Sequence, residues 1–186
     1  MNKINLLISD FDGTLVDTFY ANLAAYQKAF KECGYKLSAE QYKACFGLRF
    51  DKFMDSMQIH DNETRKKIKE IKSEVYPQYF HNLKVNTSLL EFIKSFKING
   101  GKTAVASTAR RKNLMNALDY IEASNYFDLI LAGEDVSKGK PDPEIYIKVL
   151  EYFQMKPEEA LAFEDSEIGI KATENAGISY IKINIQ

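Results

Sequence analysis

The chain has 186 residues, of which 45% are hydrophobic and 27% charged, a composition typical of a folded globular protein. Its 25 basic and 26 acidic residues give a formal net charge of -1, so nucleic acid and anionic membranes are not expected partners. Cys33 and Cys45 form no CxxC pair, which argues against a disulfide scaffold or a zinc site. The sequence shows neither a signal peptide nor a membrane span, and we expect a cytoplasmic protein that acts on small molecules.

The chain opens with a predicted buried strand. The apolar run Ile4–Ile8 ends just before Asp10, and Gly13 with Thr14 permits a sharp turn at the carboxyl end of that strand. Ligand sites of open α/β sheets lie at such ends. If Asp10 and Asp12 both face this crevice, their carboxylates repel each other unless a cation or a proton intervenes. Mg²⁺ suits such oxygen ligands.

A helical pattern follows over residues 18–83. Ala21–Glu32 has helical spacing, Ser38 and Gln41 predict a capping box, and Asp61 predicts the start of a helix that runs to about residue 81. We therefore expect a small helical bundle.

This bundle interrupts the strand–helix alternation directly after the first strand. We interpret it as an inserted lid domain, residues 17–84, standing over the carboxyl end of that strand, with an α/β core formed by residues 1–16 and 85–186. The linkers are expected near Val16–Thr18 and Leu83–Asn86. Such a lid can exclude water and select the substrate.

Beyond the bundle, strand and helix patterns alternate, which predicts a doubly wound parallel sheet in a Rossmann-like core. The expected strands are Lys102–Ser107, Leu129–Ala132, Ala160–Glu164 and Ile178–Ile183, and the expected helices are Ala109–Glu122, Pro143–Phe153 and Glu167–Asn175. The last strand is expected to leave an open sheet edge, which dimerisation would cover. We expect a monomer or a weak homodimer.

Residues suited to phosphoryl transfer follow the carboxyl ends of the predicted strands. A phosphoryl group in transfer needs a nucleophile, a metal ion, hydroxyl or amide donors, and a fixed cation. The candidates are Asp10 and Asp12, Ser107 and Thr108, Lys140, and Glu164 and Asp165.

Four segments resemble, in order and spacing, the motifs of the haloacid dehalogenase superfamily. They are DFDGTLVD from Asp10, STAR from Ser107, GKPDPEIY around Lys140, and FEDSEIGIKATENAG around Asp165. The helical insertion resembles the cap of the subfamily that includes β-phosphoglucomutase and phosphoglycolate phosphatase. The resemblance spans nearly the whole chain and implies a Mg²⁺-dependent phosphatase that hydrolyses a small phosphate monoester through an aspartyl phosphate.

The resemblance also implies roles for single residues. Asp10 would attack phosphorus, and Asp12 would act as general acid and then as general base. Mg²⁺ would be held by the carboxylates of Asp10 and Asp165 and by the backbone carbonyl of Asp12, with Glu164 in or near the layer of residues behind these metal ligands.

Ser107 and Thr108 would bind phosphate oxygens, Lys140 would neutralise charge on the phosphoryl group and on the attacking aspartate, and Thr14 would steady the turn that aims Asp12.

Structural interpretations of the same residues remain open. Ser107 is also a candidate cap for the helix expected from Ala109, a role compatible with phosphate binding at a helix amino terminus. Glu164 and Asp165 also fit a plain acidic helix start. Lys138 competes with Lys140 as the fixed cation, and we prefer Lys140 because two nearby prolines stiffen its segment.

Three functions compete: a phosphatase, a sugar-phosphate mutase, and a non-enzymatic phospho-acceptor resembling a response-regulator receiver. β-Phosphoglucomutases typically carry a histidine shortly after the first motif. The region Asp17–Asn22 has none, and Asn22 occupies about that place, which favours water as the acceptor. Arg49 and Arg110 could each grip a second anionic group of the substrate or be ordinary solvated residues. A receiver lacks a helical insertion after its first strand.

Overall fold

The computed structural model describes residues 3–184. The chain divides into two compact units. The first, called here the core unit, comprises Met1–Asp17 and Val85–Gln186. The second, called here the helical unit, comprises Thr18–Lys84.

The core unit is built on five parallel strands in the order β5-β4-β1-β6-β7. The strands are β1 (Leu6–Ser9), β4 (Lys102–Ala106), β5 (Leu129–Leu131), β6 (Ala160–Glu164) and β7 (Ser179–Lys182). Ile8 of β1 pairs in register with Ala104 on one side and Ala162 on the other. The strand order reverses at β1, so the ends of β1 and its neighbours form the crevice in which ligands bind to doubly wound sheets. The predicted fold class is confirmed.

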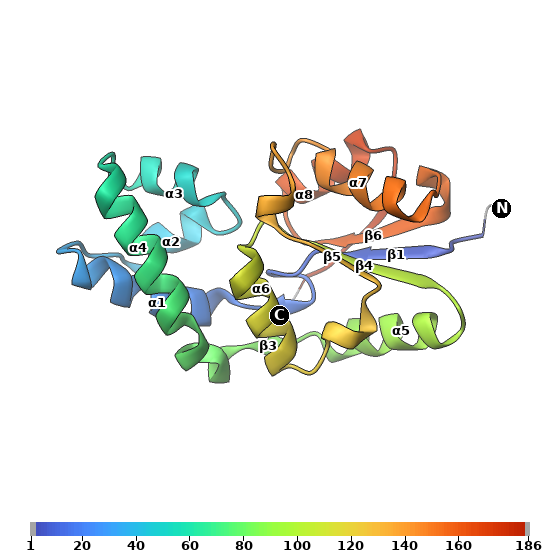
Figure 1. Ribbon diagram of the computed structural model, residues 1–186, viewed down its shortest axis with the longest axis horizontal. Helices are drawn as coiled ribbons and strands as arrows, with labels where there is room; N and C mark the ends of the chain where they lie inside the picture. Colours follow the sequence, from blue (N-terminus) through green and yellow to red (C-terminus); the bar gives the residue numbers. More distant parts are fainter. Residues whose placement is uncertain (1–2, 185–186) are drawn as a thin grey trace. The chain divides into compact units, whose positions relative to one another are not determined.

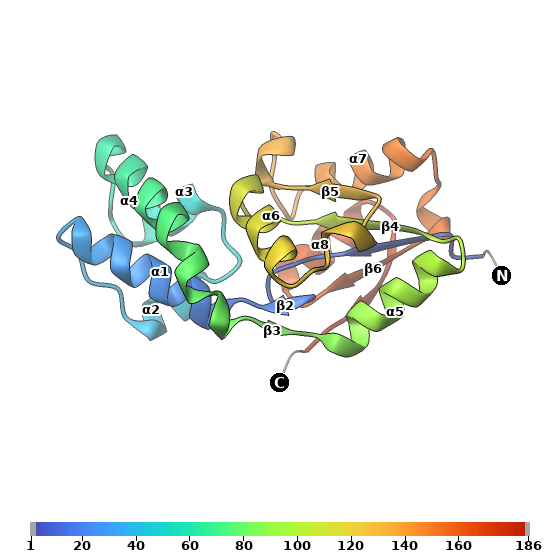
Figure 2. The same cartoon turned by 60° about the horizontal axis from the view of Figure 1, so that its bottom comes forward.

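Helices cover both faces of this sheet (Figures 1 and 2). One face carries α5 (Thr87–Ile98) and α6 (Arg111–Tyr120), and the other carries α7 (Glu144–Phe153) and α8 (Glu167–Asn175). Side chains alternate between faces along a strand, which places Leu6 and Ile8 in one cluster with apolar residues of α7 and α8. Three short 3₁₀ turns complete the unit: η2 (Ser124–Tyr126), η3 (Gly133–Asp135) and η4 (Pro157–Glu159).

Some predicted boundaries were wrong. The helix expected from Ala109 begins at Arg111, because residues 107–110 form a separate turn after β4. The strand expected over Ile178–Ile183 is limited to Ser179–Lys182. Ala160–Glu164 and Glu167–Asn175 match their predicted bounds.

The helical unit contains α1 (Phe19–Glu32), α2 (Ala39–Cys45), α3 (Phe50–Ser56), α4 (Asn62–Val75) and the 3₁₀ segment η1 (Tyr76–Asn82). Its core is rich in aromatic rings, with Phe30 stacked on Phe53 at 5.7 Å between centroids. The capping box at Ser38 and the cap at Asp61 are confirmed. The helix expected to reach residue 81 changes to 3₁₀ after Val75, because a proline at position 77 cannot continue the α-helical hydrogen bonds.

The two expected linkers contain a short element that the sequence did not predict. Strands β2 (Val16–Asp17) and β3 (Lys84–Val85) pair as a two-stranded sheet where the chain passes between the units. Within the described residues 3–184, we find no helix that combines the length and the apolar character required to cross a bilayer.

Candidate active site

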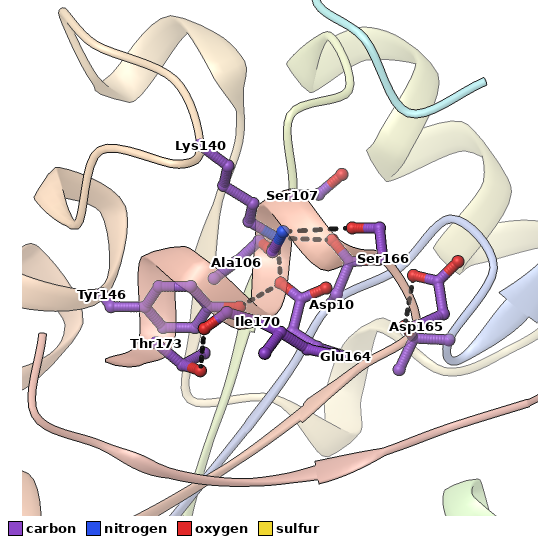
Figure 3. A network of polar contacts seen from close by, with 12 residues as sticks. Asp10, Ala106, Ser107, Lys140, Tyr146, Glu164, Asp165, Ser166, Ile170 and Thr173 are labelled. Carbon is purple, nitrogen blue, oxygen red and sulfur yellow. Dashed lines mark hydrogen bonds and ion pairs between the residues drawn. The ribbon is translucent and has the colours of Figure 1, made fainter. Parts of the chain in front are cut away.

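A buried lysine joins three elements of the core unit at the carboxyl ends of β1, β4 and β6 (Figure 3). Lys140 Nζ donates to Asp10 Oδ1 at 2.7 Å, to Glu164 Oε1 at 2.6 Å and to the backbone carbonyl of Ala106 at 2.9 Å. The lysine side chain is 3% exposed, whereas that of Lys138 is 75% exposed. The structure therefore places Lys140, and not Lys138, beside Asp10. Burial opposes the charge of Lys140, but the carboxylates of Asp10 and Glu164 outweigh it and raise its pKa well above the usual range.

Glu164 is fully enclosed. Its Oε1 accepts hydrogen bonds from Lys140 Nζ and from the phenol of Tyr146, which lies on the first turn of α7. Its Oε2 is buried and faces Gly169, where an added Cβ would lie 2.0 Å from that oxygen. Burial raises the pKa of Glu164 to about 7. The carboxylate of Glu164, at the carboxyl end of β6, thus holds the ammonium of Lys140 in position.

Asp165 follows β6 and lies against the turn after β1. The hydroxyl of Thr14 donates to Asp165 Oδ1 at 3.1 Å. Gly13 has φ +87°, and an added Cβ would lie 2.2 Å from Asp165 Oδ2, so this turn requires glycine for both conformation and space. Burial, with the nearby charge of Asp10, raises the pKa of Asp165 to about 6. Thr14 was expected to steady the turn that aims Asp12. In the structure its hydroxyl binds Asp165, which joins this turn to the residue after β6.

The three carboxylates form a group suited to a divalent cation. Asp10, Glu164 and Asp165 each offer an oxygen within 4.8 Å of the others. All donors are carboxylate oxygens, the ligand type that Mg²⁺ prefers. Lys140 neutralises one of the three charges, and the raised pKa of Asp165 reflects burial and the repulsion that remains. The donor set therefore fits Mg²⁺.

Ser107 directly follows β4, at the same edge of the sheet. Its hydroxyl lies 3.5 Å from Asp12 Oδ2 and accepts from the backbone N–H of Ala109 at 3.0 Å. The prediction that Ser107 caps the following helix was wrong, because that helix begins after Arg110. Ser107 instead fixes the turn before the helix. Thr108 lies half-buried on this turn, with its carbonyl close to Gly133.

Of the three residues predicted to contact the substrate, one belongs to the core unit and two belong to the helical unit. Arg110 Nε is 3.5 Å from Glu134 Oε1, in a partly exposed pair on the core unit. Asn22 is buried in α1, and Arg49 is the residue before α3, both in the helical unit. Their roles remain predictions.

Two contributors to the cluster were missed from sequence alone. Tyr146 belongs to the segment around Lys140, and it lies with Ile145 in the buried core cluster, in the first turn of α7. Glu144, the residue before Ile145, accepts hydrogen bonds from the loop that carries Lys140. The short interval between Lys140 and these residues was the available signal.

Comparison with known proteins agrees with this geometry. The profile of the haloacid dehalogenase-like hydrolase family matches residues 7–183. The phosphorylated carbohydrates phosphatase of Thermotoga maritima is 31% identical over 181 residues, covering 94% of this chain and 82% of that protein. The phosphoglycolate phosphatase of Aquifex aeolicus is 28% identical over 197 residues, covering 98% and 89%.

The crystal structure of CbbY from Rhodobacter sphaeroides in complex with phosphate is similar in fold, with a TM-score of 0.90 and 25% identity. The match covers 98% of this chain and 87% of that one. With a family profile that spans nearly its whole length and a phosphatase relative above 30% identity, this chain belongs to the haloacid dehalogenase-like hydrolase family.

Proposed function

We propose that the chain is a Mg²⁺-dependent phosphatase that hydrolyses a small phosphate monoester, such as a sugar phosphate, through an aspartyl phosphate at Asp10. The observation that carries the proposal is the carboxylate of Asp10, held 2.7 Å from the buried ammonium of Lys140 at the carboxyl end of β1. A carboxylate can act as a nucleophile toward phosphorus.

The reaction proceeds in two displacements. An oxygen of Asp10 bonds to phosphorus while the bond to the leaving oxygen breaks, and Asp12 gives that oxygen a proton. Asp12, now a carboxylate, takes a proton from water as the water oxygen bonds to phosphorus. The bond to Asp10 breaks, and inorganic phosphate leaves with the original aspartate restored.

The other residues of the cluster bind and orient. Lys140 and Ser107 would donate to phosphoryl oxygens, and Glu164 with Tyr146 would hold the lysine in place through the hydrogen bonds at Glu164 Oε1. Mg²⁺ would be held by Asp10, Asp165 and the backbone carbonyl of Asp12, with the Glu164 carboxylate beside these ligands, where its Oε1 binds Lys140. When bound, the ion supplies positive charge that stabilises the phosphoryl oxygens in the transition state.

The helical unit is proposed to act as the cap that selects the substrate, with Asn22 and Arg49 among its contacts and Arg110 contributing from the core unit. The relative from Thermotoga maritima is named for phosphorylated carbohydrates, which supports a sugar phosphate as the substrate class. The second candidate is a sugar-phosphate mutase. The absence of a histidine in the sequence Asp17–Asn22 favours the phosphatase.

The test is phosphate release from sugar phosphates, phosphoglycolate and nucleotides, with Mg²⁺ or with a chelator. Asp10→Asn, which keeps the shape of the side chain and removes its charge, is the control. We expect Mg²⁺-dependent release that the substitution abolishes. Isomerised sugar without release would identify the mutase instead, and release that survives Asp10→Asn would refute the proposed nucleophile.

A further inference from the structure

The loop between β5 and α7 carries Lys140, and its position must be held closely. The ammonium lies within 2.9 Å of three oxygens at the carboxyl ends of β1, β4 and β6. A misplacement of about 1 Å at a reacting centre can reduce a rate by about 100-fold. The residues that fix this loop are therefore relevant to activity even where they lie away from Asp10.

Glu144 fastens the loop through its backbone. Its Oε1 accepts the N–H of Ser137 at 2.9 Å, and its Oε2 accepts the N–H of Lys138 at 2.8 Å. Both carboxylate oxygens are used, on two successive peptide groups just ahead of Lys140. Hydrogen bonds to an ionised acceptor are stronger than those between neutral groups. Glu144 also begins α7, so the contact joins the loop to a packed helix.

Lys148 holds Glu144 from the next turn of α7. Its Nζ lies 3.0 Å from Glu144 Oε1 and donates to the backbone carbonyl of Asp135 at 2.6 Å. The carboxylate of Asp135 in turn accepts the N–H of Ala132 at 2.7 Å, which closes the short turn η3. Lys148 thus connects Asp135, near the start of the loop, with the carboxylate of Glu144, which binds the middle of the loop.

A second acid fixes the far end of the loop. Asp142 Oδ1 accepts the N–H of Glu144 at 3.0 Å, and the N–H of Asp142 donates to the carbonyl of Gly139 at 3.1 Å. The loop is therefore bound to α7 on both sides of Lys140, through the N–H groups of Ser137 and Lys138 before it and through the side chain of Asp142 after it. None of these contacts, all within the described part of the chain, includes Asp10 or Asp165.

We propose that Glu144, supported by Lys148, is a positioning residue that acts on the reaction through Lys140. The inference rests on the proposed phosphatase function. Glu144→Ala frees two backbone N–H groups and the loop that carries the lysine, and we expect kcat to fall about 10- to 100-fold. Glu144→Gln keeps one oxygen acceptor and should recover part of this loss. Lys148→Met should cause a smaller fall.

The kinetic test compares kcat and KM of these variants on an aryl phosphate with Mg²⁺. Glu151→Gln, an exposed acid on the same helix, is the matched control and should equal the wild type. Glu144→Ala is also combined with Lys140→Ala. If the glutamate acts through the lysine, its removal should cost less than two-fold in kcat once Lys140 is absent. A purely structural role would leave the same fold-loss in both backgrounds and would refute the inference.

Hydrogen exchange measured by mass spectrometry provides a readout independent of turnover. Glu144→Ala should accelerate exchange in peptides that cover residues 137–143 and leave peptides from β1 and β6 unchanged. Unchanged exchange in the loop would contradict the fastening role. The two proposals fail in different ways. If the wild-type protein releases no phosphate although its loop is protected from exchange, the phosphatase function is refuted and this inference with it. If the wild-type protein is active and Glu144→Ala has the same kcat and KM, this inference alone is refuted.

Discussion

Replacement of Lys140 by methionine tests the electrostatic balance of the site. The substitution keeps an unbranched apolar chain of similar length and removes the ammonium. In the wild type this ammonium lies 2.7 Å from Asp10 and 2.6 Å from Glu164, whose side chains are 9% and 0% exposed. The variant leaves these buried carboxylates without a counter-ion.

Removing one partner of a buried ion pair typically costs about 3–5 kcal/mol, because the remaining charge has lost both its solvent and its partner. We expect a loss of this size in the free energy of unfolding at pH 8 without Mg²⁺. The loss should be smaller at pH 5. Without Lys140, the folded-state pKa of Glu164 rises further above its unfolded value of about 4.3, so the folded protein takes up a proton as the pH falls and recovers stability.

The assay is urea unfolding of the wild type and Lys140→Met at pH 5 and pH 8, in chelator and at constant ionic strength. Lys171→Met is the control, since Lys171 is 60% exposed and its pair with Glu174 belongs to a class that contributes about 0.2–1 kcal/mol. The reasoning is refuted if Lys140→Met is no more destabilising than Lys171→Met at pH 8, or if its deficit grows toward pH 5.

Three further predictions concern the turn after β1, the metal-free protein and the helical unit. Gly13→Ala should lower the free energy of unfolding by about 1–3 kcal/mol and kcat by at least ten-fold, because φ at this position is +87° and the new Cβ would lie 2.2 Å from Asp165 Oδ2. Urea unfolding and phosphate release measure the two effects, and near-wild-type values in both assays would contradict the role assigned to this turn. Because the pKa of Asp165 is raised to about 6 from 3.8, the stability of the metal-free protein should fall as the pH rises from about 4 to about 6, by roughly 1–2 kcal/mol after solvent screening. Mg²⁺ should remove this fall. Thermal melts across this pH range test the prediction, and a metal-free stability that stays flat or rises would count against it. Asp61→Ala removes the carboxylate whose Oδ2 accepts the N–H of Thr64 at 2.7 Å and caps α4, so it should lower the Tm and leave kcat unchanged. A loss of kcat in fully folded protein would contradict this prediction, because it would show that this helix end affects the reaction.

Much of the core unit follows from local sequence. The apolar run before Asp10 and the run Ala160–Glu164 are both short and bounded, so their strands were predictable. Parallel strands bring their carboxyl ends to one edge of the sheet, and that rule placed Asp10 and Glu164 together before the structure showed their common contact with Lys140. Lys140 lies on the loop between β5 and α7, and its assignment rested on the family resemblance and on the two nearby prolines.

The parts that were missed depend on contacts between distant residues. Strands β2 and β3 have two residues each, too few for a periodic pattern, and their pairing joins positions about seventy residues apart. The partner of Thr14 is Asp165, far along the chain, so the sequence identified the turn without its contact. Tyr146 looks like an ordinary core aromatic until Glu164 is seen at its hydroxyl.

The central claim is that Asp10 carries the phosphoryl group, and chemical trapping tests it most directly. The substrate that the panel identifies is mixed with enzyme and Mg²⁺, the reaction is quenched in acid within milliseconds, and peptides are analysed for an added phosphoryl group. Asp12→Asn is run in parallel on an aryl phosphate, whose leaving group departs without a proton from residue 12. Loss of the general base should then slow only the attack of water and let the intermediate accumulate. The account predicts a phosphoryl group on residue 10 in Asp12→Asn, formed no more slowly than that variant turns over. A phosphoryl group on another residue, or turnover with residue 10 unmodified in both proteins, would contradict it.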